Sequence, residues 1–262
     1  MVTSIPMRYE LVAGSGTKVT NLNVYKNKER LDNNNLGFVK IANYLMKNIQ
    51  KMEAFMPSYE KMQIYIDNEL KDYIKYYYRF ADLMYIQAKT GEMTYRYDIN
   101  RAYLTMLSPF IPDDKFEKFY KNKEEFIKAV GFTGYRYYIR DILTNEIVAI
   151  QNAKRPDILN FCIEALNFIK DELFELMGSH INFYYIDCCG FDISLDEQLD
   201  DYNELLTLIL KNFYEKNGID SSKMKNVTVK KEGEYEITYK DGIYYLGEHP
   251  FFAIKNNRLY NL

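Results

Sequence analysis

The sequence predicts an α+β fold in which an antiparallel sheet is backed by helices. Two observations support this prediction: the spacing of apolar residues switches between periods of 3.6 and 2, and short polar connections join neighbouring strand-like segments. The chain has 262 residues, 47% apolar and 27% charged, as in ordinary globular proteins with a sizeable core. We expect one compact body of three consecutive segments: a mostly helical segment at 1–92, a core at 93–195, and a helix with a hairpin at 196–262.

The N-terminal segment begins with glycines and a cluster of asparagines, which predict strands and turns over residues 1–35. Two helices are expected next, at 38–52 and 67–88, because apolar residues recur there at helical spacing. In the second helix these residues are Leu70, Ile74, Tyr77, Ala81 and Met84. Gly91 is expected to end this helix in a left-handed conformation.

A half-buried strand is predicted at 93–99, where four apolar residues alternate with polar ones. Asp98 therefore lies on the polar face of this strand. A helix is expected from 113 to 131, begun by two capping aspartates. Two strands at 135–142 and 147–151 flank a short polar turn, as in a hairpin.

The clearest helix begins at Pro156 and ends before Gly178. Its polar residues gather on one side, as in an amphipathic helix. They are Asp157, Asn160, Glu164, Asn167, Asp171 and Glu175.

A buried strand at 181–187 is predicted to meet a turn at 188–190, which puts Asp187 at the tip of a hairpin. A helix at 196–215 and a hairpin at 234–246 follow. The predicted order is therefore mixed helix and antiparallel sheet.

Charge and cysteine content exclude several classes of protein. The formal net charge of −3 argues against a protein coated in basic groups, although a nucleic-acid binder can confine Lys and Arg to one groove. Three cysteines, with Cys188 and Cys189 adjacent, make no disulfide framework, and without a secretory leader a cytoplasmic location is expected. Apolar runs are far shorter than the roughly 20 residues that cross a bilayer, so no membrane contact is expected.

Two aspartates are the candidate catalytic residues, Asp98 at a strand end and Asp187 at a hairpin tip. Taken alone, each is what strand ends and turns commonly contain, because Asp solvates and caps. Their contexts are more specific. Residues 97–103 resemble motif A of phage-type family B DNA polymerases, in which an aspartate is followed five residues later by a tyrosine, here Tyr103.

Residues 184–191 resemble motif C of the same family, an apolar strand ending in Tyr-x-Asp-Thr-Asp-Ser. Asp187 matches the first aspartate, and Cys189 stands in place of the second. Because a soft thiol is a poor magnesium ligand, this substitution puts ordinary activity in doubt.

Lys128, Thr133 and Tyr135 resemble a degenerate motif B. The three motifs occur in the family's order, with the predicted hairpin and long helix between motifs B and C. The resemblance covers the palm region of the family, at about residues 93–195.

The resemblance implies nucleotidyl transfer to a DNA primer, with Mg²⁺ or Mn²⁺ as cofactor and with DNA and deoxynucleotides as partners. Asp98 and Asp187 would be catalytic metal ligands, and either Asp187 or Asp192, which lies on the returning strand, would take over from the missing one. The nucleotide-binding residues would be Ile99 through its carbonyl, Tyr103 beneath the deoxyribose, Lys128 at the triphosphate, and Tyr135.

Two functions remain open from the sequence. The first is a reduced nucleotidyltransferase of phage or plasmid replication, acting in the host cytoplasm. The second is an inactive palm derivative that binds DNA, a replication protein or a host factor. Cys189, which is expected at an exposed hairpin tip, decides between them through the metal site. We also expect no proofreading exonuclease, because only about 90 residues precede motif A.

Overall fold

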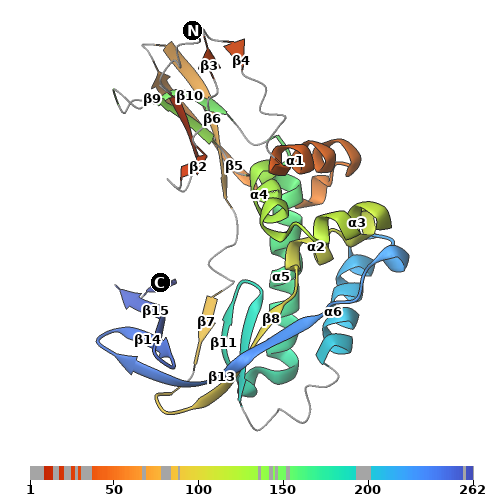
Figure 1. The fold of residues 1–262 in the computed structure, drawn as a ribbon, viewed down its shortest axis with the longest axis vertical. Coiled ribbons are helices and arrows are strands. Elements are labelled where there is room, and N and C mark those ends of the chain that lie inside the picture. The colour runs from red at the N-terminus through yellow and green to blue at the C-terminus, as the bar shows by residue number, and fades with distance from the viewer. Residues whose placement is uncertain are drawn as a thin grey trace, which may run out of the picture. The chain divides into compact units, whose positions relative to one another are not determined.

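The computed structural model describes most of the chain (Figure 1). The described residues are 9–13, 18–20, 25–26, 29–30, 37–66, 69–77, 84–87, 89–134, 137–141, 144, 147–151, 154–192, 202–255 and 258–261. None of the described helices is long and apolar enough to span a membrane.

The chain divides into two compact units, each built from two stretches of sequence. The first unit combines Met1–Tyr78 with Glu117–Phe161, and the second combines Arg79–Phe116 with Cys162–Leu262. The expected single body of three consecutive segments therefore differs from the observed division, because the central region contributes to both units.

The first unit contains a four-stranded antiparallel sheet in the order β10-β9-β1-β2. Its strands are β1 (Tyr9–Ala13), β2 (Lys18–Thr20), β9 (Tyr137–Asp141) and β10 (Ile147–Gln151). The predicted hairpin around residue 144 is confirmed, since β9 pairs with β10. A two-residue pair, β3 (Tyr25–Lys26) with β4 (Glu29–Arg30), lies in the same unit.

The predicted helix at 67–88 is wrong. Residues 69–77 instead form β6 (Glu69–Tyr77), which pairs along nine residues with β5 (Ser58–Ile66). The error has a physical cause: residues four positions apart, such as Leu70 and Ile74, share a face in a strand as well as in a helix. The expectation of a mostly helical N-terminal segment is therefore also wrong, although Gly91 does have a positive φ of 91°.

The helices of the first unit include α1 (Gly37–Asn48), α4 (Lys123–Gly134) and the start of α5 (Pro156–Met177), a helix whose residues after Phe161 belong to the second unit. Helices α1 and α4 pack through Phe38, Val39, Ala42 and Ala129, and the rings of Phe38 and Phe132 meet edge to face. The predicted helix at 38–52 is confirmed but ends earlier, before the short helix η2 (Glu53–Phe55). The single helix predicted at 113–131 is two helices, because α3 (Asp113–Tyr120) ends before α4 begins.

Six elements of the second unit form a βαββαβ set, with other helices and strands inserted at residues 100–155 between its first strand and its first helix. In order the six are β8 (Met93–Ile99), α5 (Pro156–Met177), β11 (Ile181–Tyr185), β12 (Cys188–Asp192), α6 (Tyr202–Lys216) and β13 (Val229–Lys240). The four strands are antiparallel in the order β13-β8-β12-β11. This is the split βαβ, or ferredoxin-like, arrangement. The predicted α+β class with an antiparallel sheet and backing helices is therefore confirmed.

Four further strands extend this sheet to eight. β7 (Met84–Ile86) pairs with β11, while β14 (Ile243–Leu246), β15 (His249–Lys255) and β16 (Arg258–Asn261) continue from β13. The hairpin predicted about Asp241 and Gly242 is confirmed, with φ of 53° and 81° at these residues. Two consecutive positive φ values suit the type I′ turn that matches strand twist.

The two faces of the sheet have different coverings. On one face Tyr97 and Phe191 contact the ring of Tyr202 from α6, and Tyr184 contacts Phe174 from α5. On the other face Phe183 and Cys188 pack with side chains from β13, β14 and β15. The helices therefore back one face, and the curled C-terminal strands cover part of the other.

Helix α5 is less amphipathic than its sequence suggests, because three residues of its polar side are buried: Asp157, Asn160 and Asn167. The side chain of Asn160 donates to the Phe55 carbonyl at 2.9 Å, so its burial is compensated. The amide of Asn167 makes no hydrogen bond with any described residue.

Candidate functional site

Asp98 and Asp187 lie at the same end of the paired strands β8 and β12. Asp98 is opposite Cys188, the residue after Asp187, so the β-carbons of this pair are about 5 Å apart. The amide of Ile99 donates to the carbonyl of Asp187 at 2.8 Å. Both aspartates are half-buried. The backbone thus brings the two predicted catalytic residues side by side.

The turn that carries Asp187 is formed by Ile186 and Asp187 themselves, two residues earlier than predicted. Gly190 suggested a turn but lies inside β12, where a Cβ would overlap the ring of Phe183. Ile186 has a φ of 54°, which is costly for a β-branched residue. Such strain is often stored beside functional groups, and here it immediately precedes a candidate carboxylate.

The shifted turn puts both cysteines inside β12 and not in the turn. Cys188 shares a face with Asp98, whereas Cys189 is opposite Tyr97 and faces the helices beside Tyr202. Cys189 is 3% exposed, so the expectation that it lies at an exposed hairpin tip is wrong. The cysteine next to Asp98 is therefore Cys188, and not Cys189, the residue that the motif C resemblance aligns with the second aspartate.

A cationic group missed by the sequence analysis borders this site. Arg96 donates from Nε to Cys188 Sγ at 3.2 Å and forms an ion pair with Glu232 at 2.9 Å. The ring of Phe251 lies 5.8 Å from its guanidinium carbon. Arg96 could have been found, since alternation puts it on the face of Asp98. Glu232 could not, because a bulge between residues 231 and 233 shifts the register of β13.

The electrostatics of the cluster keep the thiol neutral. The pKa of Cys188 is raised to about 12, mainly by burial and to a smaller extent by the carboxylates of Asp98 and Asp187, while Arg96 opposes the shift. Burial lowers the pKa of Arg96, but Cys188, Glu232 and Asp98 together raise it above its ordinary value. At neutral pH the site therefore holds a thiol, not a thiolate, beside Asp98.

Raising the pH above about 9 is expected to destabilise the protein steeply. Burial raises the pKa of Cys188, Cys189 and Tyr184 above the ordinary values of 9.0 for thiols and 10.0 for phenols. The unfolded chain then releases protons that the folded chain keeps, so the free energy of unfolding falls with pH by up to about 1.4 kcal/mol per unit for each group. Urea titrations between pH 7 and 11 measure this slope.

The matched control for the alkaline prediction is Cys189→Ala, which removes one buried titrating group and should make the fall shallower. A free energy of unfolding that is flat between pH 8 and 11 would contradict the burial of these groups.

Asp192 lies away from the other two aspartates. It is opposite Thr94 and four residues after Cys188 in β12, a rise of about 13 Å along the strand. Within the described part of the chain, no group of three or more His, Cys, Asp or Glu side chains is gathered so that it could hold a metal ion. The three predicted metal ligands therefore reduce to one adjacent pair.

The predicted nucleotide-binding residues are divided between the two units. The Ile99 side chain is 4% exposed, and Tyr103 lies half-buried in α2 (Ala102–Met106), shortly after Asp98. Lys128 belongs to the first unit, where it is half-exposed and 3.9 Å from Glu124. Tyr135 falls outside the described residues.

Comparison with known proteins adds no assignment: neither a protein-family model nor a curated protein matches this chain. The relevant features of the site are two neighbouring carboxylates at one end of a strand pair, a strained turn, and a buried thiol bound by Arg96.

Proposed function

We propose that the protein is a reduced, palm-like nucleotidyltransferase that adds deoxynucleotides to a DNA primer in phage or plasmid replication. The observation that carries this proposal is the pairing of β8 with β12, which puts Asp98 beside the turn of Asp187. The family that the sequence resembles likewise carries motifs A and C on neighbouring strands. The split βαβ topology is compatible with this function, but proteins with this topology have many different functions. The support for the proposal therefore comes from the pair of carboxylates, Asp98 and Asp187.

Two carboxylates suffice for one magnesium ion. Mg²⁺ keeps several water ligands and is commonly bound by one or two carboxylates together with substrate phosphates. Asp98 and Asp187 would supply these carboxylates, and the bound ion would neutralise charge on the phosphoryl oxygens. The site offers poorer ligands for a second metal ion, because Asp192 lies four residues after Cys188 in β12 and Cys188 itself is a neutral thiol. We therefore propose one protein-held Mg²⁺ or Mn²⁺.

Asp98→Asn and Asp187→Asn are each expected to abolish primer extension and to weaken Mg²⁺ binding at least tenfold. An amide keeps the shape of the side chain but removes the charge that a hard cation requires. Isothermal titration with Mg²⁺ and Mn²⁺, together with extension of a labelled primer, measures both effects.

Asp192→Asn is the matched control, since it makes the same chemical change on the same sheet and should alter neither measurement. Equal loss in all three variants would show that overall charge, not the Asp98–Asp187 pair, controls metal binding. The proposal would be contradicted if the parent protein binds neither Mg²⁺ nor Mn²⁺ and extends no primer.

The second candidate function, an inactive palm derivative that binds DNA or a protein, is favoured by one observation. Phe251 from β15 contacts Arg96, Phe183 and Tyr185 on the sheet face that carries Asp98, so part of this face is covered. If the protein is an inactive DNA-binding derivative, the Asp98→Asn variant should bind DNA as tightly as the parent protein does. The affinity of both proteins for DNA should fall steeply as the salt concentration rises. Salt-independent binding, or none at low ionic strength, would favour a protein partner.

A further inference from the structure

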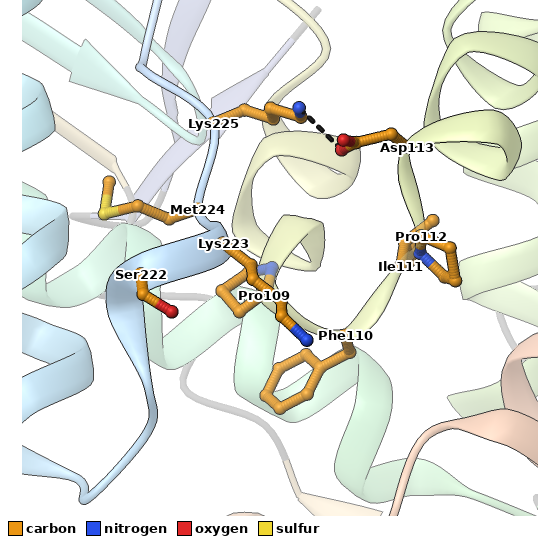
Figure 2. A pocket seen from close by; sticks show the side chains of 9 residues that line it. All are labelled: Pro109, Phe110, Ile111, Pro112, Asp113, Ser222, Lys223, Met224 and Lys225. Carbon is orange, nitrogen blue, oxygen red and sulfur yellow. Dashed lines mark ion pairs between the residues drawn. The ribbon is translucent and has the colours of Figure 1, made fainter.

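A pocket of about 480 Å³ lies in the second unit, between two segments that are distant in sequence. One wall is residues 109–113, which lead from η4 (Ser108–Phe110) into α3, and the other is residues 222–225, in and after η7 (Ser221–Lys223) (Figure 2). The volume is within the range of about 300–1,000 Å³ common for small-molecule sites. Asp98 and Asp187 do not line this pocket.

The two walls are held together by Lys225. Its backbone amide donates to the hydroxyl of Ser108 at 3.0 Å, and Ser108 is fully buried. Its ammonium lies 2.7 Å from an Asp113 carboxylate oxygen and 5.7 Å from the centre of the Phe116 ring. The shape of the pocket is thus fixed by contacts within the protein, and a preformed site loses less conformational freedom when a ligand binds.

The pocket lining combines apolar walls with a cation and a hydroxyl. Pro109, Phe110, Ile111 and Met224 supply rings, a branched chain and a thioether. Ser222 and Lys223 are exposed and belong to the wall of residues 222–225. In Figure 2 the side chain of Lys223 reaches from this wall toward Phe110. Among the described residues that line the pocket, Asp113 is paired with Lys225, whereas Lys223 is exposed and has Asp220 as a nearby carboxylate. The ammonium of Lys223 can therefore attract an anion into the pocket.

We propose that this pocket binds a small flat ring that carries a phosphate, with nucleoside monophosphates as the representative class. Aromatic rings make favourable contacts with flat rings, so Phe110 would contact the base. The ammonium of Lys223 and the hydroxyl of Ser222 would donate to the phosphate, in charge-assisted hydrogen bonds for the lysine. This proposal does not depend on nucleotidyl transfer, because its residues are separate from Asp98 and Asp187.

Isothermal titration of dAMP and dTMP into the full chain, with EDTA present to suppress metal-dependent binding, tests the proposal. One saturable site is expected, and deoxyadenosine alone or inorganic phosphate alone should bind at least tenfold more weakly, because each fills only part of the pocket. Lys223→Ala and Phe110→Ala are each expected to weaken dAMP binding about tenfold. Lys211→Ala, which removes an exposed lysine of α6 outside the pocket, should have no effect.

Asp98→Asn should bind dAMP as the parent does, so failure of this proposal and failure of the proposed catalysis are distinguishable. Circular dichroism checks that Phe110→Ala is folded, and Lys223→Glu gives an independent test because charge reversal at an exposed position leaves the fold intact. The proposal is overturned if dAMP does not saturate, or if binding is unchanged in Lys223→Ala, Lys223→Glu and Phe110→Ala.

Discussion

Asp157→Ala is expected to lower the free energy of unfolding of the first unit by about 3–5 kcal/mol, because it removes one partner of a buried ion pair and leaves the other unpaired. Asp157 is fully buried and Arg155 is 12% exposed, with 2.7 Å between their closest atoms. Water therefore cannot replace the lost carboxylate. Urea unfolding and hydrogen exchange of the α1 amides measure the effect.

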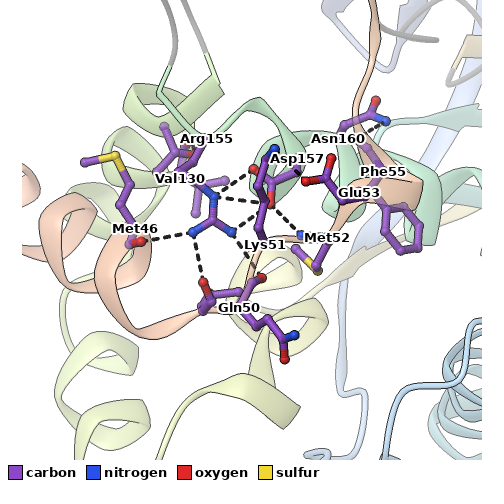
Figure 3. Close-up of polar contacts among 12 residues, drawn as sticks. Met46, Gln50, Lys51, Met52, Glu53, Phe55, Val130, Arg155, Asp157 and Asn160 are labelled. Carbon is purple, nitrogen blue, oxygen red and sulfur yellow. Dashed lines mark hydrogen bonds and ion pairs between the residues drawn. The ribbon is translucent and has the colours of Figure 1, made fainter.

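Loss of the Arg155–Asp157 pair should have a large effect because the pair joins two distant stretches of the first unit, residues 46–52 and 155–157 (Figure 3). Arg155 donates to the carbonyls of Met46, Ile49 and Gln50 at 2.8–3.1 Å, at and just after the end of α1. These are carbonyls that a helix C-terminus leaves without internal partners. Asp157 at the start of α5 accepts from the amide of Met52 at 3.0 Å as well as from Arg155. The cluster therefore links the end of α1 to the start of α5.

Glu53→Ala is the matched control for Asp157→Ala. Glu53 forms an ion pair with Lys51 at 2.6 Å in the same region, but both side chains are more than half exposed. Its loss should reduce stability by less than about 1 kcal/mol. If Asp157→Ala is no more destabilising than Glu53→Ala, the cluster does not hold the unit together. Asp157→Asn, which keeps an acceptor for the Met52 amide, should fall between the two.

Cys189→Asp is expected to destabilise the second unit by about 4 kcal/mol at pH 7. Cys189 is 3% exposed between β12 and α6, so an introduced carboxyl group would have to stay protonated there. Holding an aspartate neutral about three pH units above its ordinary pKa of about 3.9 requires about 1.4 kcal/mol per unit. The loss should shrink as the pH falls towards 4, because the unfolded chain then binds the same proton. Urea midpoints at pH 4, 5.5 and 7 measure it.

Cys189→Ala separates charge burial from lost packing, since its smaller destabilisation should not change between pH 4 and pH 7. A Cys189→Asp variant as stable as the parent at pH 7, or with tighter Mg²⁺ binding, would mean that the carboxyl group reaches the face of Asp98. The structure predicts neither outcome, because Cys189 and Asp98 project from opposite faces of the sheet.

The elements with a single strong local signal could be predicted from the sequence alone. These include the strand at 93–99, where alternation puts Tyr97 and Ile99 in the core and leaves Asp98 half-buried, and α5, which is set by Pro156 and a long apolar pattern. The hairpin at Asp241 and Gly242 was equally clear, because few residues tolerate two positive φ values in succession. The neighbourhood of Asp98 and Asp187 was predicted only through a family resemblance.

Tertiary contacts decided what local patterns left ambiguous. The spacing of Leu70 and Ile74 suits a helix and a strand equally, and pairing with β5 selects the strand. The hairpin turn depends on the ring of Phe183, which requires Gly190 inside the strand and so moves the turn to Asp187. Because the turn ends at Asp187, both cysteines lie inside β12, where side chains alternate between faces, so Cys188 shares the face of Asp98 and Cys189 does not. The burial of Asp157 likewise depends on Arg155 and on the end of α1, a partner about 105 residues away that no local pattern reveals.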